Sequence, residues 1–259
     1  MWLCRSGLIK MKFIFITLFP EFIADACNFS IIKRGREAGL FTVQSINPRD
    51  FTTDNHRTVD DTPCGGGAGM VLKVEPFFAA LAAARAFAPD ALVVALTPAG
   101  EVLGQPRVEQ LAQAQQDIIF LCGHYEGFDQ RILDQADLKI SIGDYVLTGG
   151  EMPALVMLDT LIRFIPGVLG KSESAMEESF SNNLLEYPQY TRPIEYQGKT
   201  VPDILLSGDH AKIKQWRLKE AIRTTYLLRP DLLAKANLSK GEGKLFLEVV
   251  AETKDKTNE

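Results

Sequence analysis

The stretch Asp117-Ile118-Ile119-Phe120-Leu121-Cys122, followed directly by Gly123-His124-Tyr125-Glu126-Gly127, decides the fold of this chain. A short apolar run that ends at a glycine is typical of a strand buried on both faces. Such strands belong to parallel sheets that helices cover on either side. Ligands of these sheets bind beyond the carboxyl ends of the strands, so the loop after Cys122 is the first candidate site.

The segments on either side of this stretch alternate between strand and helix patterns. Further buried strands are predicted at residues 11–19, 91–97 and 138–147, and helices at residues 76–88, 105–116, 128–136 and 151–165. This alternation predicts an α/β fold with a mostly parallel sheet. Two more loops follow predicted strands, at residues 98–100 and 148–151, and we expect them to gather with loop 123–127 at one edge of the sheet.

The chain changes character after residue 170. Residues 171–183 are polar, with four serines and little apolar periodicity, which is typical of a linker. Helical spacing returns at residues 211–228 and 230–236, and the charged tail from Glu252 is expected to fray. We therefore expect an N-terminal extension (residues 1–10), an α/β domain (11–170), a flexible linker (171–184) and a small helical domain (185–259).

Composition places the chain among ordinary globular proteins and excludes disordered, collagenous and disulfide-scaffold classes. Of its 259 residues, 46% are apolar and 24% are charged, and the net charge is −5. The charge is uneven, because residues 199–240 carry nine Lys and Arg against four Asp and Glu. The asymmetry predicts one cationic face in the helical domain, which would include Lys212, Lys214, Arg217, Lys219 and Arg223.

The cysteine pattern and the absence of a membrane segment indicate a cytoplasmic protein. The four cysteines are scattered, with no CxxC pair and three histidines as co-ligands, so a structural zinc site is not expected. The apolar run at residues 13–19 is similar to a secretory signal, but Pro20 and Glu21 interrupt it too early. No run reaches the roughly 18–20 apolar residues of a membrane helix.

Two glycine-rich stretches are candidates for phosphate or ligand binding. Residues 167–172 are similar to a P-loop, but Ile165 stands where that motif needs a glycine, so an NTPase is not expected. The cluster at residues 65–69 has two interpretations, a flexible turn or a place where the backbone approaches a ligand closely. The cluster alone does not decide between them.

Several motifs resemble the bacterial tRNA (guanine-N1)-methyltransferase family, TrmD. They occur in the order of the family at residues 18–21 (LFPE), 48–52 (PRDFT), 58–61 (TVDD), 65–70 (GGGAGM), 122–127 (CGHYEG), 141–151 (SIGDYVLTGGE), 163–170 (RFIPGVLG), 187–193 (YPQYTRP) and 205–210 (LLSGDH). The resemblance implies a SPOUT methyltransferase, in which a parallel sheet with a deep trefoil knot holds S-adenosylmethionine. It also implies an obligate homodimer that methylates N1 of guanine at tRNA position 37.

The resemblance implies a set of donor-binding residues, mostly in the loops after the strands. They are Leu96, Thr97, Gly123, Tyr125, Ile142, Gly143, Asp144, Tyr145, Val146, Leu147, Gly149 and Gly150. A dependence on Mg²⁺ is implied as well, with Glu126 as a participant. The implied partners are the anticodon arm of tRNA and a second copy of the chain, and neither a membrane nor DNA.

The implied chemistry needs a base, because N1 of neutral guanine carries a proton. Glu178 stands at the position of this base, where the family commonly has Asp. Arg163 matches the arginine that meets the negative charge growing on O6. The expected tRNA-binding residues are Asp60, Ser207, His210, Lys214 and Arg217.

Two other functions remain open at this point. The chain is either the methyltransferase, or a non-catalytic RNA-binding relative that lost turnover through the substitution at Glu178, or a SPOUT enzyme that acts on ribosomal RNA. Methylation assays on tRNA and on ribosomal fragments separate the three.

Overall fold

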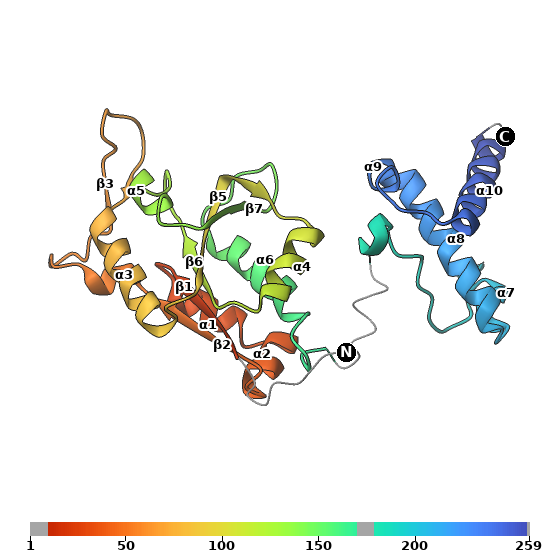
Figure 1. Ribbon diagram of the computed structural model, residues 1–259, viewed down its shortest axis with the longest axis horizontal. Coiled ribbons are helices and arrows are strands. Elements are labelled where there is room, and N and C mark those ends of the chain that lie inside the picture. Colours follow the sequence, from red (N-terminus) through yellow and green to blue (C-terminus); the bar gives the residue numbers. More distant parts are fainter. Residues whose placement is uncertain (1–9, 170–178, 258–259) are drawn as a thin grey trace. The chain divides into compact units, whose positions relative to one another are not determined.

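The computed structural model describes residues 10–169 and 179–257. The chain divides into two compact units, residues 1–172 and 173–259, and we describe each by itself. The first unit holds a five-stranded sheet, and the second consists mainly of helices (Figure 1).

The sheet of the first unit is entirely parallel, which confirms the predicted α/β fold. Its strands are β1 (Met11–Ile16), β2 (Phe41–Ile46), β5 (Leu92–Val102), β6 (Ile118–Cys122) and β7 (Leu138–Ser141), in the order β2-β1-β6-β5-β7. All five residues of β6 are buried at the centre of the sheet. The apolar run that opened the sequence analysis is therefore the central strand.

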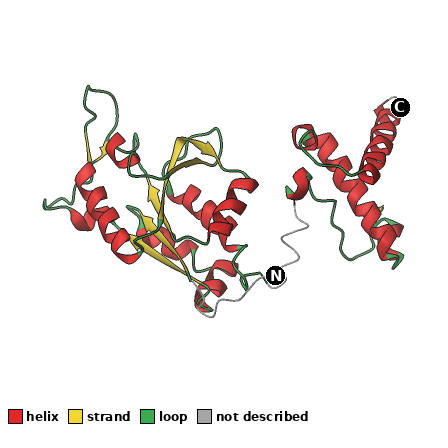
Figure 2. Ribbon diagram, viewed as in Figure 1, coloured by secondary structure: helices red, strands yellow, loops and turns green. Residues whose placement is uncertain are grey.

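Helices cover both faces of the sheet, because side chains alternate between the two faces of each strand (Figure 2). On one face, Phe13 and Phe120 pack with helices α1 (Pro20–Ala26), α4 (Gln105–Ala114) and α6 (Glu151–Ile162). On the other face, Ile14 and Ile119 pack with α3 (Val74–Phe87) and α5 (Gln130–Leu133). Helix α2 (Ser30–Glu37) precedes β2.

The boundaries of three strands differ from the prediction. β1 ends at Ile16 and not at residue 19, and α1 begins at Pro20. β5 continues through residues 98–100, which were expected to form a loop, and its register against β7 shifts between Leu96 and Glu101. This bulge accommodates Pro98, and Gly100 passes so close to the backbone of Ile140 that a Cβ there would collide. β7 ends at Ser141 instead of residue 147, because the Ser141 hydroxyl bonds to the backbone of Gly143 and turns the chain.

Smaller elements that the periodicity did not predict complete the first unit. The 3-10 helix η1 (Pro48–Phe51) follows β2, and β3 (Asp60–Asp61) pairs with β4 (Val71–Leu72) in an antiparallel hairpin. This hairpin carries the glycine cluster of residues 65–69 at its tip.

The second unit is built around two long helices, α8 (His210–Leu228) and α10 (Lys240–Thr257). Its shorter elements are η3 (Ser181–Asn183), β8 (Glu195–Tyr196), β9 (Lys199–Thr200), α7 (Asp203–Leu206) and α9 (Pro230–Leu233). Ile222 and Val249 are fully buried in its core. The expectation that the tail frays from Glu252 is wrong, because α10 continues to Thr257 and Glu252 pairs with α8. Within the described residues, none of the helices has the length and apolar character that crossing a membrane requires.

Candidate active site

A cavity of about 300 Å³ lies in the first unit, at the carboxyl ends of the strands. Its walls come from the chain that follows β6 and β7 and from the irregular part of β5, as expected for an open parallel sheet. Most of the predicted donor-binding residues line it: Leu96, Thr97, Gly123, Tyr125, Ile142, Gly143, Tyr145, Val146, Leu147, Gly149 and Gly150. Asp144 belongs to the same loop but is not among the lining residues.

The loop of residues 142–150 forms much of this wall because it returns from the edge of the sheet to its centre. The Gly150 N–H donates to the carbonyl oxygen of Gly123 (2.8 Å), and His124 forms an antiparallel bridge with Gly149. A Cβ on Gly150 would lie 2.7 Å from Cα of Cys122, so only glycine permits this approach. The glycines therefore serve the packing of one loop on another.

The lining of the cavity fits a ligand that combines an aromatic ring with polar edges. Tyr125 and Tyr145 are each about half exposed at the cavity, and the Tyr145 hydroxyl donates to the carbonyl oxygen of Ile142 (3.2 Å). Val146 and Leu147 add exposed apolar surface in the same loop. Such a mixture of rings, apolar side chains and backbone groups suits the adenine and the aliphatic arm of S-adenosylmethionine.

Cys122, at the end of β6, is not a nucleophile of this site. Burial, and secondly the nearby charge of Glu151, raise the pKa of its thiol well above the ordinary value. The thiol therefore stays protonated, and only a thiolate attacks.

Glu126 packs against the glycine cluster. A Cβ on Gly69 would collide with the Glu126 carboxylate, and the Glu126 N–H donates to the carbonyl oxygen of Met70 (3.0 Å). Gly69 is thus required by a close approach within the protein itself. In the described ranges, no three His, Cys, Asp or Glu side chains gather closely enough to hold a metal ion, so the residues present do not fit a protein-held Mg²⁺.

Of the two predicted catalytic residues, the structure describes Arg163, which does not line the cavity. Arg163 is the C-cap of α6, whereas the cavity lies at the N-terminal end of that helix, about 18 Å away at 1.5 Å per residue. Glu178 lies outside the described residues. Asp60 lies in β3 opposite Leu72, which bridges to the cavity residue Phe128 and so brings the hairpin close to the cavity.

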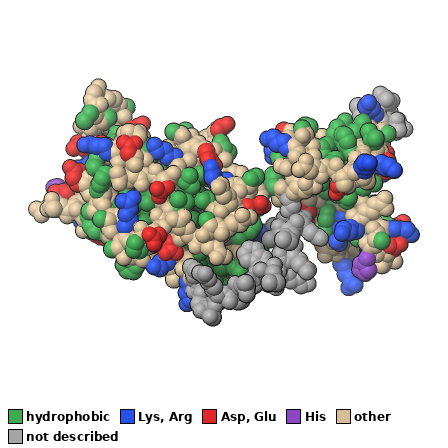
Figure 3. Space-filling model, in the orientation of Figure 1, with side chains coloured by type: hydrophobic (Ala, Val, Ile, Leu, Met, Phe, Trp, Pro, Cys, Tyr) green, Lys and Arg blue, Asp and Glu red, His purple; other side chains and the backbone are tan. Residues whose placement is uncertain are grey.

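The predicted RNA-binding residues of the second unit lie at or near the N-terminal half of α8. His210 is the first residue of α8, and Ser207 precedes it, with its hydroxyl donating to the carbonyl oxygen of Ile204 (2.7 Å). The Arg217 guanidinium lies 4.9 Å from the centre of the Tyr187 ring, and Lys214 is exposed. Lys and Arg side chains are prominent on the visible surface of this unit (Figure 3).

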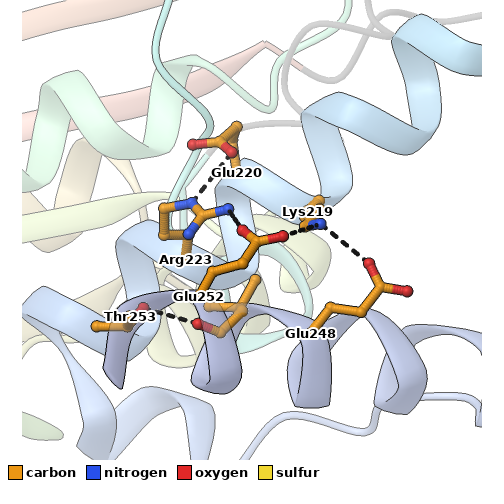
Figure 4. A network of polar contacts seen from close by, with 7 residues as sticks. Lys219, Glu220, Arg223, Glu248, Glu252 and Thr253 are labelled. Carbon is orange, nitrogen blue, oxygen red and sulfur yellow. Dashed lines mark hydrogen bonds and ion pairs between the residues drawn. The ribbon is translucent and has the colours of Figure 1, made fainter. Parts of the chain in front are cut away.

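The C-terminal half of α8 does not contribute to the cationic face as predicted. The Lys219 ammonium pairs with Glu248 (2.9 Å) and Glu252 (2.7 Å), both from α10 (Figure 4). Arg223 pairs with Glu252 as well (2.5 Å) and with Glu220 (3.1 Å). Hydrogen bonds from the two cations lower the pKa of Glu252 to about 2. The periodicity of α8 could not show the pairs with α10, because Glu248 and Glu252 lie 29 to 33 residues further along the chain than Lys219 and Arg223.

Fold and cavity together define an α/β domain with a ligand site at the carboxyl edge of a parallel sheet. The model of the family described as tRNA (Guanine-1)-methyltransferase TrmD matches residues 11–235, and the chain belongs to this family.

Curated relatives over nearly the whole chain carry the name tRNA (guanine-N(1)-)-methyltransferase. One from Synechococcus sp. (strain JA-3-3Ab) is 51% identical over 93% of this chain and 95% of its own. Those from Desulfitobacterium hafniense (strain Y51) and Syntrophomonas wolfei subsp. wolfei are 50% and 49% identical, over 93% and 95% of this chain and 92% and 100% of theirs.

Proposed function

We propose that this chain is an enzyme that transfers a methyl group from S-adenosylmethionine to N1 of guanine at tRNA position 37, next to the anticodon. The observation that carries the proposal is family membership over residues 11–235 together with a cavity whose lining suits the donor. The relatives are named for methylation of guanine N1 in tRNA.

The donor cavity is the part of the site that one chain supplies by itself. S-adenosylmethionine, when bound there, supplies an activated methyl group. The loop of residues 142–150 and the loop after β6 hold it through backbone groups and the Tyr125 and Tyr145 rings. The glycines that pack these loops together also let the ligand approach the backbone.

Glu178 and Arg163 carry the chemistry at the guanine in this proposal. The Glu178 carboxylate takes the proton from N1 and so frees the lone pair that accepts the methyl group. The negative charge that then grows on O6 is stabilised by the Arg163 guanidinium, whose planar donors suit an oxyanion.

We also propose that the active form is a homodimer. Two observations support it. Arg163 lies about 18 Å along α6 from the end that meets the cavity, so a second copy is needed to complete a site that uses both. Helices α1 and α6 contact one another and leave the apolar side chains Phe22, Met152 and Val156 40–54% exposed. A two-fold pairing of this apolar face would bury it.

The path of the chain supports a trefoil knot at the donor cavity. β7 pairs with β5 at the edge of the sheet, yet the next segment returns to β6 through the Gly149 bridge and the Gly150 hydrogen bond. In a knot the returning segment would also thread a loop, which the connections of other sheets do not do. We propose that this return passes through the knot of the SPOUT class.

The helical unit is proposed to bind the anticodon arm, with Lys214 and Arg217 at the phosphates and His210 and Ser207 beside them. Asp60 is proposed to contact the neighbourhood of the target guanine.

A requirement for Mg²⁺ is carried by the resemblance alone, so we assign no step of the reaction to the metal. A cytoplasmic location is likewise proposed, on the pattern of scattered cysteines.

Methylation of tRNA transcripts tests the proposed function. A transcript with guanine at position 37 should gain one methyl group at N1, mapped by mass spectrometry of nuclease fragments, and the same transcript with adenine there should gain none. No methylation of either transcript by protein that binds the donor would favour a non-catalytic RNA-binding relative. Methylation of ribosomal fragments in preference to tRNA would favour the other SPOUT class.

A further inference from the structure

A network of hydrogen bonds joins Thr17, Glu151 and His124 behind the wall of the donor cavity. Glu151 is 4% exposed, and both carboxylate oxygens have partners: the Thr17 hydroxyl donates to Oε1 (2.6 Å), and His124 Nε2 lies 2.7 Å from Oε2. The Thr17 oxygen in turn accepts from the Phe19 N–H (3.0 Å). The Glu151 carboxylate accepts hydrogen bonds at both oxygens when the His124 ring carries a proton on Nε2.

The three residues come from segments that are far apart in the sequence. Thr17 directly follows β1, His124 follows β6, and Glu151 is the first residue of α6. The positive end of the α6 dipole favours a negative charge at this position. The hydrogen bonds among these three residues thus connect the central strands of the sheet to the first turn of α6.

Through His124, the hydrogen bonds of Thr17 and Glu151 reach the wall of the cavity. His124 and Gly149 both line the cavity, whereas Thr17 and Glu151 do not. A Cβ added to Gly149 would lie 2.3 Å from Cε1 of the His124 ring, so the two are in close contact. The His124 ring also packs edge-on against the Phe19 ring, with centroids 4.9 Å apart. Moving the ring would therefore move the turn at Gly149 and Gly150.

We propose that Glu151 is a positioning residue for the methyl-donor site, with Thr17 orienting its carboxylate. The Glu151 carboxylate holds the His124 ring over Gly149, and the two loops of the cavity wall keep the spacing that the donor needs. Charge-assisted hydrogen bonds at both carboxylate oxygens make this support stiffer than backbone contacts alone. The inference rests on the proposed function for the identity of the ligand.

The test removes the hydrogen bond from Thr17 to Glu151, because Thr17 does not line the cavity. Thr17→Val keeps the shape of the side chain but leaves Oε1 of Glu151 without its hydroxyl donor. We expect about a tenfold higher Kd for S-adenosylmethionine by titration calorimetry. The KM for the donor should rise by a similar factor, with a smaller change in kcat. Thr17→Ser restores the hydroxyl and should bind like the wild type.

The matched control is Thr160→Val, the same chemical change on α6. The Thr160 hydroxyl donates to the carbonyl oxygen of Met157 (2.9 Å), in the part of α6 that follows the cavity. This variant should bind the donor like the wild type even if its melting temperature falls. An equal loss of affinity in both valine variants would show general loosening and overturn the inference.

The outcomes separate this inference from the proposed function. Wild-type protein that does not bind the donor would refute the proposed function itself. If the wild type binds and Thr17→Val binds equally well, Glu151 does not position the site. Should Thr17→Val not fold, Glu151→Gln keeps the volume of the side chain and removes its charge. This variant is also expected to bind about tenfold more weakly, and wild-type affinity in it would equally overturn the inference.

Discussion

Replacement of Gly150 by alanine tests whether the cavity depends on the close packing of its two loops. The new Cβ would lie 2.7 Å from Cα of Cys122 and 2.8 Å from the Gly123 nitrogen, both backbone atoms that cannot rotate away. An ordinary contact begins near 3.4 Å, so the loop must retreat by about 0.7 Å. That movement stretches the Gly150 hydrogen bond to Gly123 from 2.8 Å to the limit of a hydrogen bond.

The expected cost combines the overpacking with the weakened hydrogen bond. Overpacking in a dense region costs about 1–3 kcal/mol, and the hydrogen bond contributes about 1 kcal/mol. We therefore expect the free energy of unfolding to be lower by about 2–4 kcal/mol, measured by urea unfolding followed by circular dichroism. Affinity for S-adenosylmethionine should fall by at least about tenfold, because the displaced loop forms the cavity wall.

Gly104→Ala is the matched control for this prediction. Gly104 lies in the same unit, at the N-cap of α4, and the nearest atom to its new Cβ would be Cδ of Pro106 at 3.8 Å. Loss of a glycine N-cap costs little, so unfolding should change by less than about 1 kcal/mol and donor affinity should not change. Wild-type stability and affinity in Gly150→Ala would refute the view that loop packing shapes the cavity.

The remaining predictions concern the chemistry and the helical unit. Glu178→Gln should abolish methyl transfer in single-turnover assays while donor affinity is retained, and wild-type turnover would refute the assignment of the base. Arg163→Ala should lower kcat more than it raises KM for tRNA, and the opposite split would exclude a role at O6. Lys214→Ala should lower the slope of log K against log salt for tRNA binding by about 1, and an unchanged slope would remove Lys214 from the interface. The pKa of Glu252 is lowered from 4.5 to about 2, so its ion pairs should stabilise the helical unit above pH 4.5 and lose this effect as the pH falls towards 2. Glu252→Gln should weaken the dependence of the free energy of unfolding on pH between pH 4.5 and 2. An unchanged pH dependence would show that the ion pairs of Glu252 contribute nothing to stability in solution.

The sequence by itself determined the fold class and the edge of the sheet where the site lies. The apolar run ending at Cys122 predicted a buried strand, and the loops after the strands were expected to meet because parallel strands share one carboxyl edge. The resemblance then implied a set of donor-binding residues, most of which line one cavity. These inferences succeed because burial and turn formation leave a local signal in neighbouring residues.

Only the tertiary structure decided which distant groups meet. The sequence predicted a strand through residue 147, whereas the chain turns at Gly143 and returns to the central strand. It placed Lys219 on a cationic face, whereas Lys219 pairs with Glu248 of α10. It gave no role to Thr17, which is 134 residues from its partner Glu151. Hydrogen bonds and ion pairs depend on distances in space, and no periodicity along the chain encodes the order in which strands and helices pack.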